Sequence, residues 1–259
     1  MSYAEALDWL ARNRDDSGAW GYLPGQPPAG EPTVLAAAAG AGVAADWLDR
    51  DELGWPTLLL PAALGHEPHE ALRDRAVQRI LARSGGTVSA TPGSYRGDLV
   101  GWSWVPHTFS WVEPTAWGVL SLRCAGAGEN RVNQGLAVLA DRQCEDGGWN
   151  VGTPDILGTK LQGWVYATAW VVLALPAGPV AQRGLQFLSG PAEPSTMSLS
   201  LAILARLAHG RDAADLVPHL LARQAPDGGF SGRADRTALA ACAMRAAEVG
   251  TRPFEVRVG

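Results

Sequence analysis

The sequence predicts an all-α protein in which about five or six helical hairpins close into an α/α toroid. Three observations predict this class. A glycine-aromatic turn recurs, helices of two kinds alternate, and no alternation of apolar and polar residues is long enough to build a sheet. A repeated unit of this size means that one hairpin has been copied and stacked, so that neighbouring copies bury each other's apolar faces.

The recurring turn places an aromatic residue six positions after a long polar side chain. Its copies are Arg14-Asp-Asp-Ser-Gly-Ala-Trp20, Gln143-Cys-Glu-Asp-Gly-Gly-Trp149 and Gln224-Ala-Pro-Asp-Gly-Gly-Phe230. Each copy follows a segment with helical spacing, and its glycines permit the positive φ angles that a tight turn needs. The aspartates and glycines of these turns are therefore interpreted as structural residues.

Five segments are amphipathic and carry a charged face, so we expect each to be an outer helix with one side in water. They are Tyr3–Asn13, Glu70–Ser84, Arg131–Gln143, Val180–Leu188 and Arg211–Gln224.

Six other segments are apolar on nearly every side, so each must be buried all round or face an apolar cavity. They are Pro32–Ala45, Pro56–Leu64, Pro114–Ala125, Ala167–Leu175, Ser195–Ala208 and Arg236–Val249. Proline marks the start of three of these inner helices, where its missing N–H would have no partner anyway. Closure into a ring is favoured over an open superhelix, because an open array would expose the inner face.

The longest irregular segment, Gly85–Pro106, predicts a loop over one end of the array, and long loops in compact domains are often functional. No linker divides the chain, so residues 1–259 are expected to form one domain.

Composition excludes several classes. A net charge of −5 and the absence of a basic run argue against nucleic-acid binding. The three cysteines are widely spaced, without the pairs that a disulfide framework or a zinc site needs, so no metal or cofactor is expected. They suggest a reducing compartment, and with no signal peptide apparent at the N-terminus we expect a cytoplasmic protein. The apolar stretch Leu58–Leu64 has two interpretations, a peripheral contact with a membrane or burial as a short inner helix.

The turns, together with Thr115-Ala-Trp117 and Thr237-Ala-Leu239, resemble the repeats of the squalene–hopene cyclase and protein prenyltransferase β-subunit superfamily. The resemblance covers about residues 3 to 249. The segment Phe109-Ser-Trp-Val-Glu-Pro-Thr-Ala-Trp117 is similar to a small single-domain bacterial branch of it. The resemblance implies a toroid with a central apolar cavity and a small isoprenoid-like ligand. It says nothing of the oligomeric state.

The resemblance also implies where a proton-donating residue would lie. Cyclases that protonate an isoprenoid carry Asp-x-Asp-Asp-Thr-Ala at the start of an inner helix, and the matching stretch here is Trp111-Val-Glu-Pro-Thr-Ala116. Only Glu113 keeps a carboxyl group. It is interpreted either as a general acid whose pKa burial has raised, or as a residue that stabilises a helix start, as Glu31 would in another repeat.

His107 lies just ahead of Glu113 and is interpreted either as its partner in proton transfer or as a solvent-exposed loop histidine. Aromatic residues near these two are candidates for a cavity wall that binds substrate and stabilises cations, or for core packing between hairpins. They are Trp102, Trp104, Phe109, Trp111, Trp117, Trp164, Tyr166 and Trp170.

The sequence thus favours an enzyme resembling terpene cyclases, which acts on an isoprenoid or other apolar substrate by acid-initiated cyclisation or isomerisation. The alternative is a protein of the same fold that binds an apolar ligand or a partner without catalysis. A third reading is an enzyme of different chemistry, because a fold does not fix a function.

Overall fold

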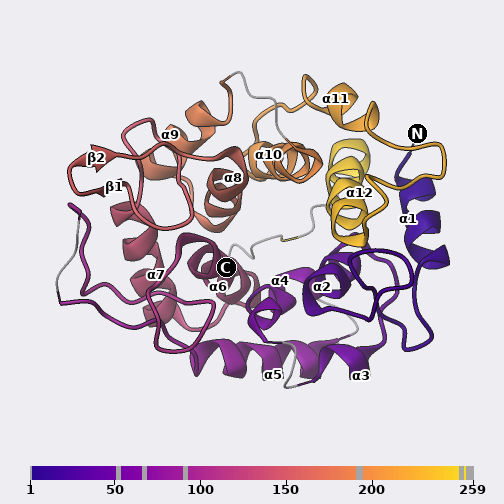
Figure 1. Ribbon diagram of the computed structural model, residues 1–259, viewed down its shortest axis with the longest axis horizontal. Coiled ribbons are helices and arrows are strands. Elements are labelled where there is room, and N and C mark those ends of the chain that lie inside the picture. Colours follow the sequence, from indigo (N-terminus) through magenta and orange to yellow (C-terminus); the bar gives the residue numbers. More distant parts are fainter. Residues whose placement is uncertain are drawn as a thin grey trace.

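A computed structural model describes residues 2–50, 54–65, 69–89, 93–190, 195–250 and Phe254. The fold is an α/α toroid, as predicted, and its inner ring runs in chain order (Figure 1). The inner elements are α2 (Gly30–Ala39), the 3₁₀ helix η2 (Trp55–Leu58) with α4 (Leu60–Leu64), α6 (Val112–Ala125), α8 (Val165–Ala174), α10 (Thr196–Ala208) and α12 (Ala234–Val249). Each packs against the next, and α12 packs against α2, so the ring closes.

The outer layer consists of helices that pack on the ring from outside. They are α1 (Tyr3–Arg12), α3 (Ala45–Leu48), α5 (Glu70–Leu81), α7 (Glu129–Asp141), α9 (Pro179–Phe187) and α11 (Val217–Leu221). The described strands are β1 (Asp155–Ile156) and β2 (Thr159–Lys160), which pair as a small antiparallel hairpin at the edge of the molecule (Figure 1). Among the described residues, no helix is both long and apolar enough to cross a membrane.

Several boundaries differ from the prediction. Helix α2 stops at Gly40, whose positive φ ends it, and the chain forms the separate helix α3 afterwards. The inner segment predicted over 56–64 is split in two, and Pro61 lies where α4 begins. Helix α11 is much shorter than the outer helix predicted over 211–224, because Pro218 fixes its first turn and forbids an earlier backbone bond. The stretch Leu58–Leu64 is an inner element with buried leucines, which agrees with the second interpretation.

One contact recurs in four repeats and ties each turn to the next inner helix. A buried threonine in the first turn of the helix accepts, through its Oγ1, a hydrogen bond from the backbone N–H of the turn aromatic. The pairs are Trp20–Thr33 at 3.0 Å, Trp102–Thr115 at 3.0 Å, Trp149–Thr168 at 2.8 Å and Phe230–Thr237 at 2.9 Å. The three tryptophans also donate their indole N–H to the last turn of the preceding outer helix, at Leu10, Ile80 and Leu139.

Candidate functional site

The threonine contact fixes how each inner helix is turned. Thr115 and Thr168 point outward to their turns, whereas residues two positions before and two after them lie on another face. On α6 these residues are Glu113 and Trp117, and on α8 they are Tyr166 and Trp170. Spaced by four, the two members of each pair lie one above the other on their helix.

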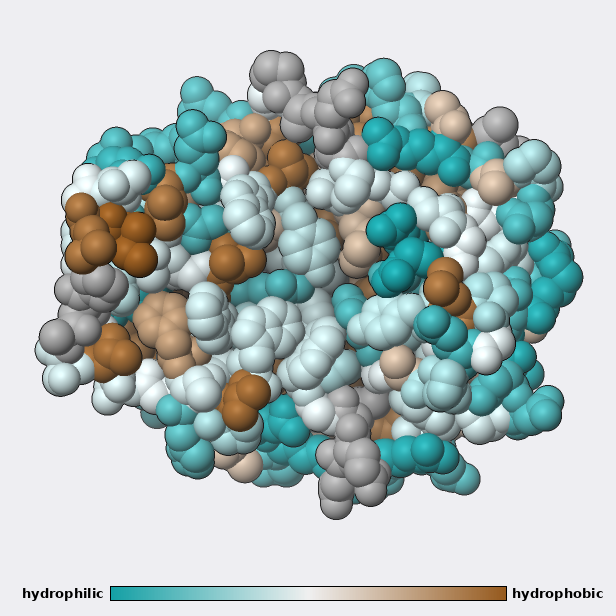
Figure 2. Space-filling view, in the orientation of Figure 1, coloured by the Kyte–Doolittle hydropathy of each residue, from teal (hydrophilic) through white to brown (hydrophobic). Residues whose placement is uncertain are grey.

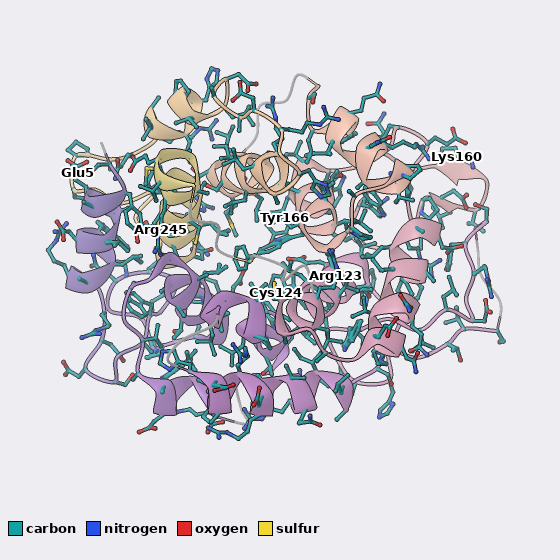
Figure 3. All side chains as sticks on the ribbon, turned by 180° about the vertical axis from the view of Figure 1, so that it is seen from behind. Glu5, Arg123, Cys124, Lys160, Tyr166 and Arg245 are labelled. Carbon is teal, nitrogen blue, oxygen red and sulfur yellow. The ribbon has the colours of Figure 1, made fainter. Side chains whose placement is uncertain are left out.

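Glu113 and Tyr166 meet between adjacent inner helices. The Tyr166 hydroxyl donates a hydrogen bond to Oε1 of Glu113 at 2.6 Å, and Glu113 is only 8% exposed. Burial raises the pKa of Glu113 to about 7, although the bond from Tyr166 acts in the opposite direction. Burial and the neighbouring carboxylate also raise the pKa of Tyr166 well above its ordinary value, so the phenol stays protonated. Figure 3 shows Tyr166 on the inner side of the ring.

A second pair of the same kind lies on the other side of the ring. Tyr22 donates a hydrogen bond to Glu31 of α2, also at 2.6 Å. Burial raises the pKa of Glu31. Glu31 acts electrostatically on Glu113 and on Tyr166, although α2 and α8 stand opposite each other in the ring. These groups therefore face one shared space at the N-terminal ends of the inner helices.

Asp235 of α12 belongs to the same end of the ring. Its carboxylate takes two bonds from the guanidinium of Arg233, at 3.0 and 2.8 Å, and it raises the pKa of Glu31 by repulsion. Arg233 also lies over the ring of Tyr22. Asp235 is therefore held as an ion pair, whereas Glu113 has a neutral phenol as its hydrogen-bond partner.

One turn further along the helices, aromatic rings form a continuous chain of contacts, which we call the aromatic column. Trp117 and Trp170 lie 5.4 Å apart, Trp117 also contacts Trp55 and Trp104, and Trp170 contacts Phe254 at 5.7 Å. Nε1 of Trp117 is buried and has no hydrogen-bond partner among the described residues. Trp117 and Trp170 of the column thus lie one helical turn after Glu113 and Tyr166 on the same helix faces.

Trp102 does not join the column. It is the turn tryptophan of a further repeat, completely buried between α6 and α7, with the Arg131 guanidinium 4.1 Å from its ring centre. A Cβ added at Gly118 or Gly135 would meet this ring at 2.7 or 2.9 Å. Trp102 therefore packs in the core between hairpins, which is the second of the two interpretations of the aromatic residues. It is not part of the candidate site.

His107 is exposed in the loop before α6, at a φ of +64°. Among the described residues, the hydrogen-bond partner of Glu113 is Tyr166 and not His107.

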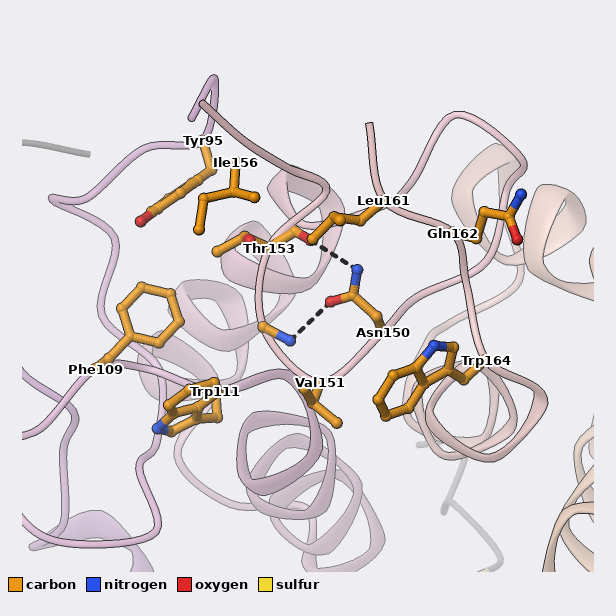
Figure 4. Close-up of a pocket in the computed structure, with 11 residues that line it drawn as sticks. Tyr95, Phe109, Trp111, Asn150, Val151, Thr153, Ile156, Leu161, Gln162 and Trp164 are labelled. Carbon is orange, nitrogen blue, oxygen red and sulfur yellow. Dashed lines mark hydrogen bonds between the residues drawn. The ribbon is translucent and has the colours of Figure 1, made fainter. Parts of the chain in front are cut away.

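The remaining aromatic candidates, Phe109, Trp111 and Trp164, line a separate pocket of about 440 Å³ at the rim, which we call the rim pocket (Figure 4). Trp111 and Trp164 immediately precede α6 and α8, so this pocket neighbours the Glu113–Tyr166 pair in sequence and in space. Apart from Trp102 in the core and Tyr166 beside Glu113, the structure divides the predicted aromatic residues between two places, the aromatic column inside the ring and the rim pocket.

Sequence reasoning missed four members of the site: Glu31 as a second inward carboxyl, its partner Tyr22, Trp55 and Phe254. Glu31 and Trp55 carried a signal, because each stands before a proline and a threonine just as Glu113 does. Tyr22 and Phe254 had none. Among the described residues, no group of three or more histidine, cysteine, aspartate or glutamate side chains is placed to hold a metal ion.

No protein-family model matches the chain, and no curated relative does. Solved structures do match. A substrate-bound variant of the type II terpene cyclase MstE from Scytonema is 19% identical, with a TM-score of 0.50 over 96% of this chain and 76% of that one. An α-1,6-mannanase variant from Salegentibacter sp. HEL1_6, in complex with α-1,6-mannotriose, is 11% identical, with a TM-score of 0.59 over 95% and 97%. These likenesses establish the fold, which serves both isoprenoid and carbohydrate chemistry, and leave the activity to be argued from the residues.

Proposed function

We propose that this protein is a terpene cyclase-like enzyme that protonates an isoprenoid or other apolar substrate inside the ring and promotes its cyclisation or isomerisation. The observation that carries the proposal is the Glu113 carboxyl, buried at the end of the aromatic column with a pKa of about 7. A carboxyl group with its ordinary pKa would be almost fully ionised at neutral pH, whereas this one keeps its proton on a large fraction of molecules.

In the proposed reaction the Glu113 proton forms a C–H bond with one carbon of a substrate double bond, whose π electrons supply that bond. The other carbon becomes a cation. A second double bond attacks it to close a ring, and loss of a proton to the Glu113 carboxylate restores the acid. Atoms and charges therefore balance in an isomerisation that needs no co-reactant.

The neighbours of Glu113 can stabilise both charges that form in this step, the carboxylate and the cation. Protonation of an alkene by a carboxylic acid is steeply uphill, so each charge must be stabilised as it forms. The Tyr166 hydroxyl donates to the carboxylate that appears, and a bond of this kind strengthens as its acceptor becomes charged. The rings of Trp117 and Trp170, one turn below, offer π-electrons to the cation. The likeness in fold to a cyclase bound to geranylgeranyl dihydroxybenzoate supports an isoprenoid-type substrate.

The test is incubation of the purified protein with farnesol, geranylgeraniol, their diphosphates and squalene, with products separated by gas chromatography and identified by mass spectrometry. A cyclised or isomerised product is expected from the wild type. Glu113→Gln should lose at least 100-fold of the rate, because the amide keeps the shape but has no acidic proton. Glu31→Gln is the matched control, since Glu31 has the same kind of phenol partner but lies on a different helix. Equal loss in both variants, or none in Glu113→Gln, would remove Glu113 as the acid.

A second candidate is a non-catalytic protein that binds an apolar ligand. The observation that favours it is Phe254, which is 4% exposed and packs on Trp170 within the space that a substrate would use. Absence of product from every substrate, with an apolar molecule recovered bound to the protein, would support this alternative over catalysis.

A further inference from the structure

The rim pocket is separate from the aromatic column and has its own walls. Three segments build it: the loop before α6, the turn after α7 with the start of the β1–β2 hairpin, and the residues that lead into α8 (Figure 4). Its lining residues are Tyr95, Phe109, Trp111, Asn150, Val151, Gly152, Thr153, Ile156, Leu161, Gln162 and Trp164.

The first wall is held rigid from behind. The guanidinium of Arg142 lies 4.2 Å from the ring centre of Tyr95 and 5.3 Å from that of Phe109. Arg142 is only 1% exposed and is paired with Asp141, and it lies behind the two rings and does not line the pocket. Phe109 in turn meets Trp111 edge to face at 5.1 Å.

The second wall is fixed by the Asn150 side chain. Its amide donates to the carbonyl of Thr153 at 2.7 Å, and its Oδ1 accepts from the N–H of Gly152 at 2.9 Å. Both polar atoms of this lining residue are thus occupied within the wall. Asp155 ties this wall to the first one, because its Oδ1 accepts from the backbone N–H of Ser94 at 2.7 Å.

The chemistry of the lining is uniform. No charged side chain lines the pocket among the residues that the structure describes, and most of the surface comes from aromatic rings and aliphatic chains. The Gln162 amide is exposed and lies at the edge (Figure 4). The mouth is apolar as well, since Val151, Ile156 and Trp164 are exposed at 38%, 45% and 55%. Figure 2 shows hydrophobic side chains gathered over the β1–β2 hairpin at this side of the molecule.

We propose that the rim pocket is a second binding site, for a neutral apolar small molecule, independent of the site at Glu113. A volume of about 440 Å³ is in the range of small-molecule sites. Walls that hydrogen bonds and stacking have already ordered lose little conformational freedom when a ligand enters, which favours binding. An anionic head group would find no cation among the lining residues, so charge selects the neutral molecule.

The test uses the neutral dye Nile red, whose emission rises in apolar surroundings, titrated into the full-length protein. Saturable binding with one dye per protein is expected in the rim pocket. Farnesol should displace the dye at least tenfold more effectively than farnesyl diphosphate, because only the diphosphate carries charge.

Two variants locate the dye. Gly152→Leu should weaken its binding at least tenfold, since even a Cβ at this position would lie 3.1 Å from the Trp111 ring and the longer side chain would occupy the pocket. Trp164→Ala removes an exposed part of the wall without disturbing the core and should also weaken dye binding. It therefore locates the dye even if Gly152→Leu fails to fold. Leu157→Ala is the matched control, because Leu157 is 83% exposed at the hairpin tip and does not line the pocket.

Glu113→Gln and Trp117→Ala address the other site and should leave dye binding unchanged. The proposal is overturned if Leu157→Ala weakens binding as much as Trp164→Ala, which would indicate nonspecific binding of the dye to the apolar surface. It is also overturned if Trp117→Ala abolishes binding, or if the diphosphate competes as well as the alcohol. These outcomes are independent of whether any isoprenoid is converted, so loss of the proposed catalytic activity would leave this result standing.

Discussion

The hydroxyl of Tyr166 donates a 2.6 Å hydrogen bond to Glu113, and both residues come from the first turns of adjacent inner helices. The same pairing recurs between Tyr22 and Glu31, also at 2.6 Å. The two pairs differ in burial and in their further neighbours, since Glu113 is buried whereas Glu31 is partly exposed and lies near Arg233. The two pairs therefore place the same two residue types in different surroundings.

The proposed catalysis should be lost as the pH rises through about 7. Glu113 is active as the protonated acid, and its pKa is raised to about 7 by burial. The rate should therefore be level at low pH and fall about tenfold per pH unit on the alkaline side. A pH–rate profile measured on a neutral substrate checks this, and a profile that rises across the same interval would assign Glu113 the role of a base.

Tyr166→Phe should move that alkaline limb to higher pH. The Tyr166 hydroxyl lowers the pKa of Glu113 by bonding to its carboxylate, so its removal leaves burial less opposed and the pKa rises further. The maximal rate should drop severalfold at the same time, because the carboxylate formed in the reaction loses its donor. Tyr22→Phe is the control and should leave the limb in place. A limb that moves to lower pH in Tyr166→Phe would contradict the assignment.

Stability should also depend on Glu113. Its pKa is about 7 in the fold and 4.5 ordinarily, so the folded state binds the proton more tightly than the unfolded chain. This contribution is complete below pH 4.5 and is lost as the pH rises through 7. The gap between the two values corresponds to about 3 kcal/mol. Urea unfolding at pH 5 and pH 8 should show this fall in the wild type and a smaller one in Glu113→Gln, whose amide does not titrate.

The threonine contact should be worth a measurable part of the free energy of unfolding. Thr168→Val keeps the shape of the side chain but leaves the buried N–H of Trp149 without its 2.8 Å partner. We expect a loss of about 1 to 3 kcal/mol. Thr159→Val, on an exposed strand residue, should change the free energy by less than about 0.5 kcal/mol. Equal small effects in both variants would show that the turn is held by packing alone.

Much of the fold could be predicted because the signals are local. The glycine-aromatic turns and the Glu-Pro-Thr starts mark where several hairpins reverse, and both are visible in the sequence. Trp102 was harder to place because its turn lacks the Asp-Gly-Gly sequence that precedes Trp149 and Phe230. The remaining signal was spacing: Trp102 precedes Thr115 by thirteen residues, as Trp20 precedes Thr33.

The site was predicted only in part, for a physical reason. Glu113 and Trp117 share a helix face by simple periodicity, and the sequence offered both as candidates. Which other groups face them depends on how the ring closes, and that is decided by contacts between helices far apart in the chain. Phe254, far from Glu113 in sequence, illustrates this, because nothing local predicts that it packs on Trp170.

Phe254 should set how large a ligand the ring accepts. Among the described residues, Trp170 contacts the rings of Trp117 and Phe254. Phe254 therefore limits the aromatic column at the Trp170 end. Phe254→Ala should open space there and shift the preference from farnesol toward geranylgeraniol, measured as the ratio of their binding constants or of their rates of conversion. Phe254→Leu, which keeps most of the volume, should leave the ratio near that of the wild type.

The thermal unfolding midpoint of Phe254→Ala separates a loss of folding from a change in cavity size, because truncation of a buried phenylalanine costs about 3 to 5 kcal/mol when the site cannot collapse. An unchanged ratio in a folded Phe254→Ala protein would place the ligand away from Phe254, whereas a shift that Trp170→Ala reproduces would place it along the column.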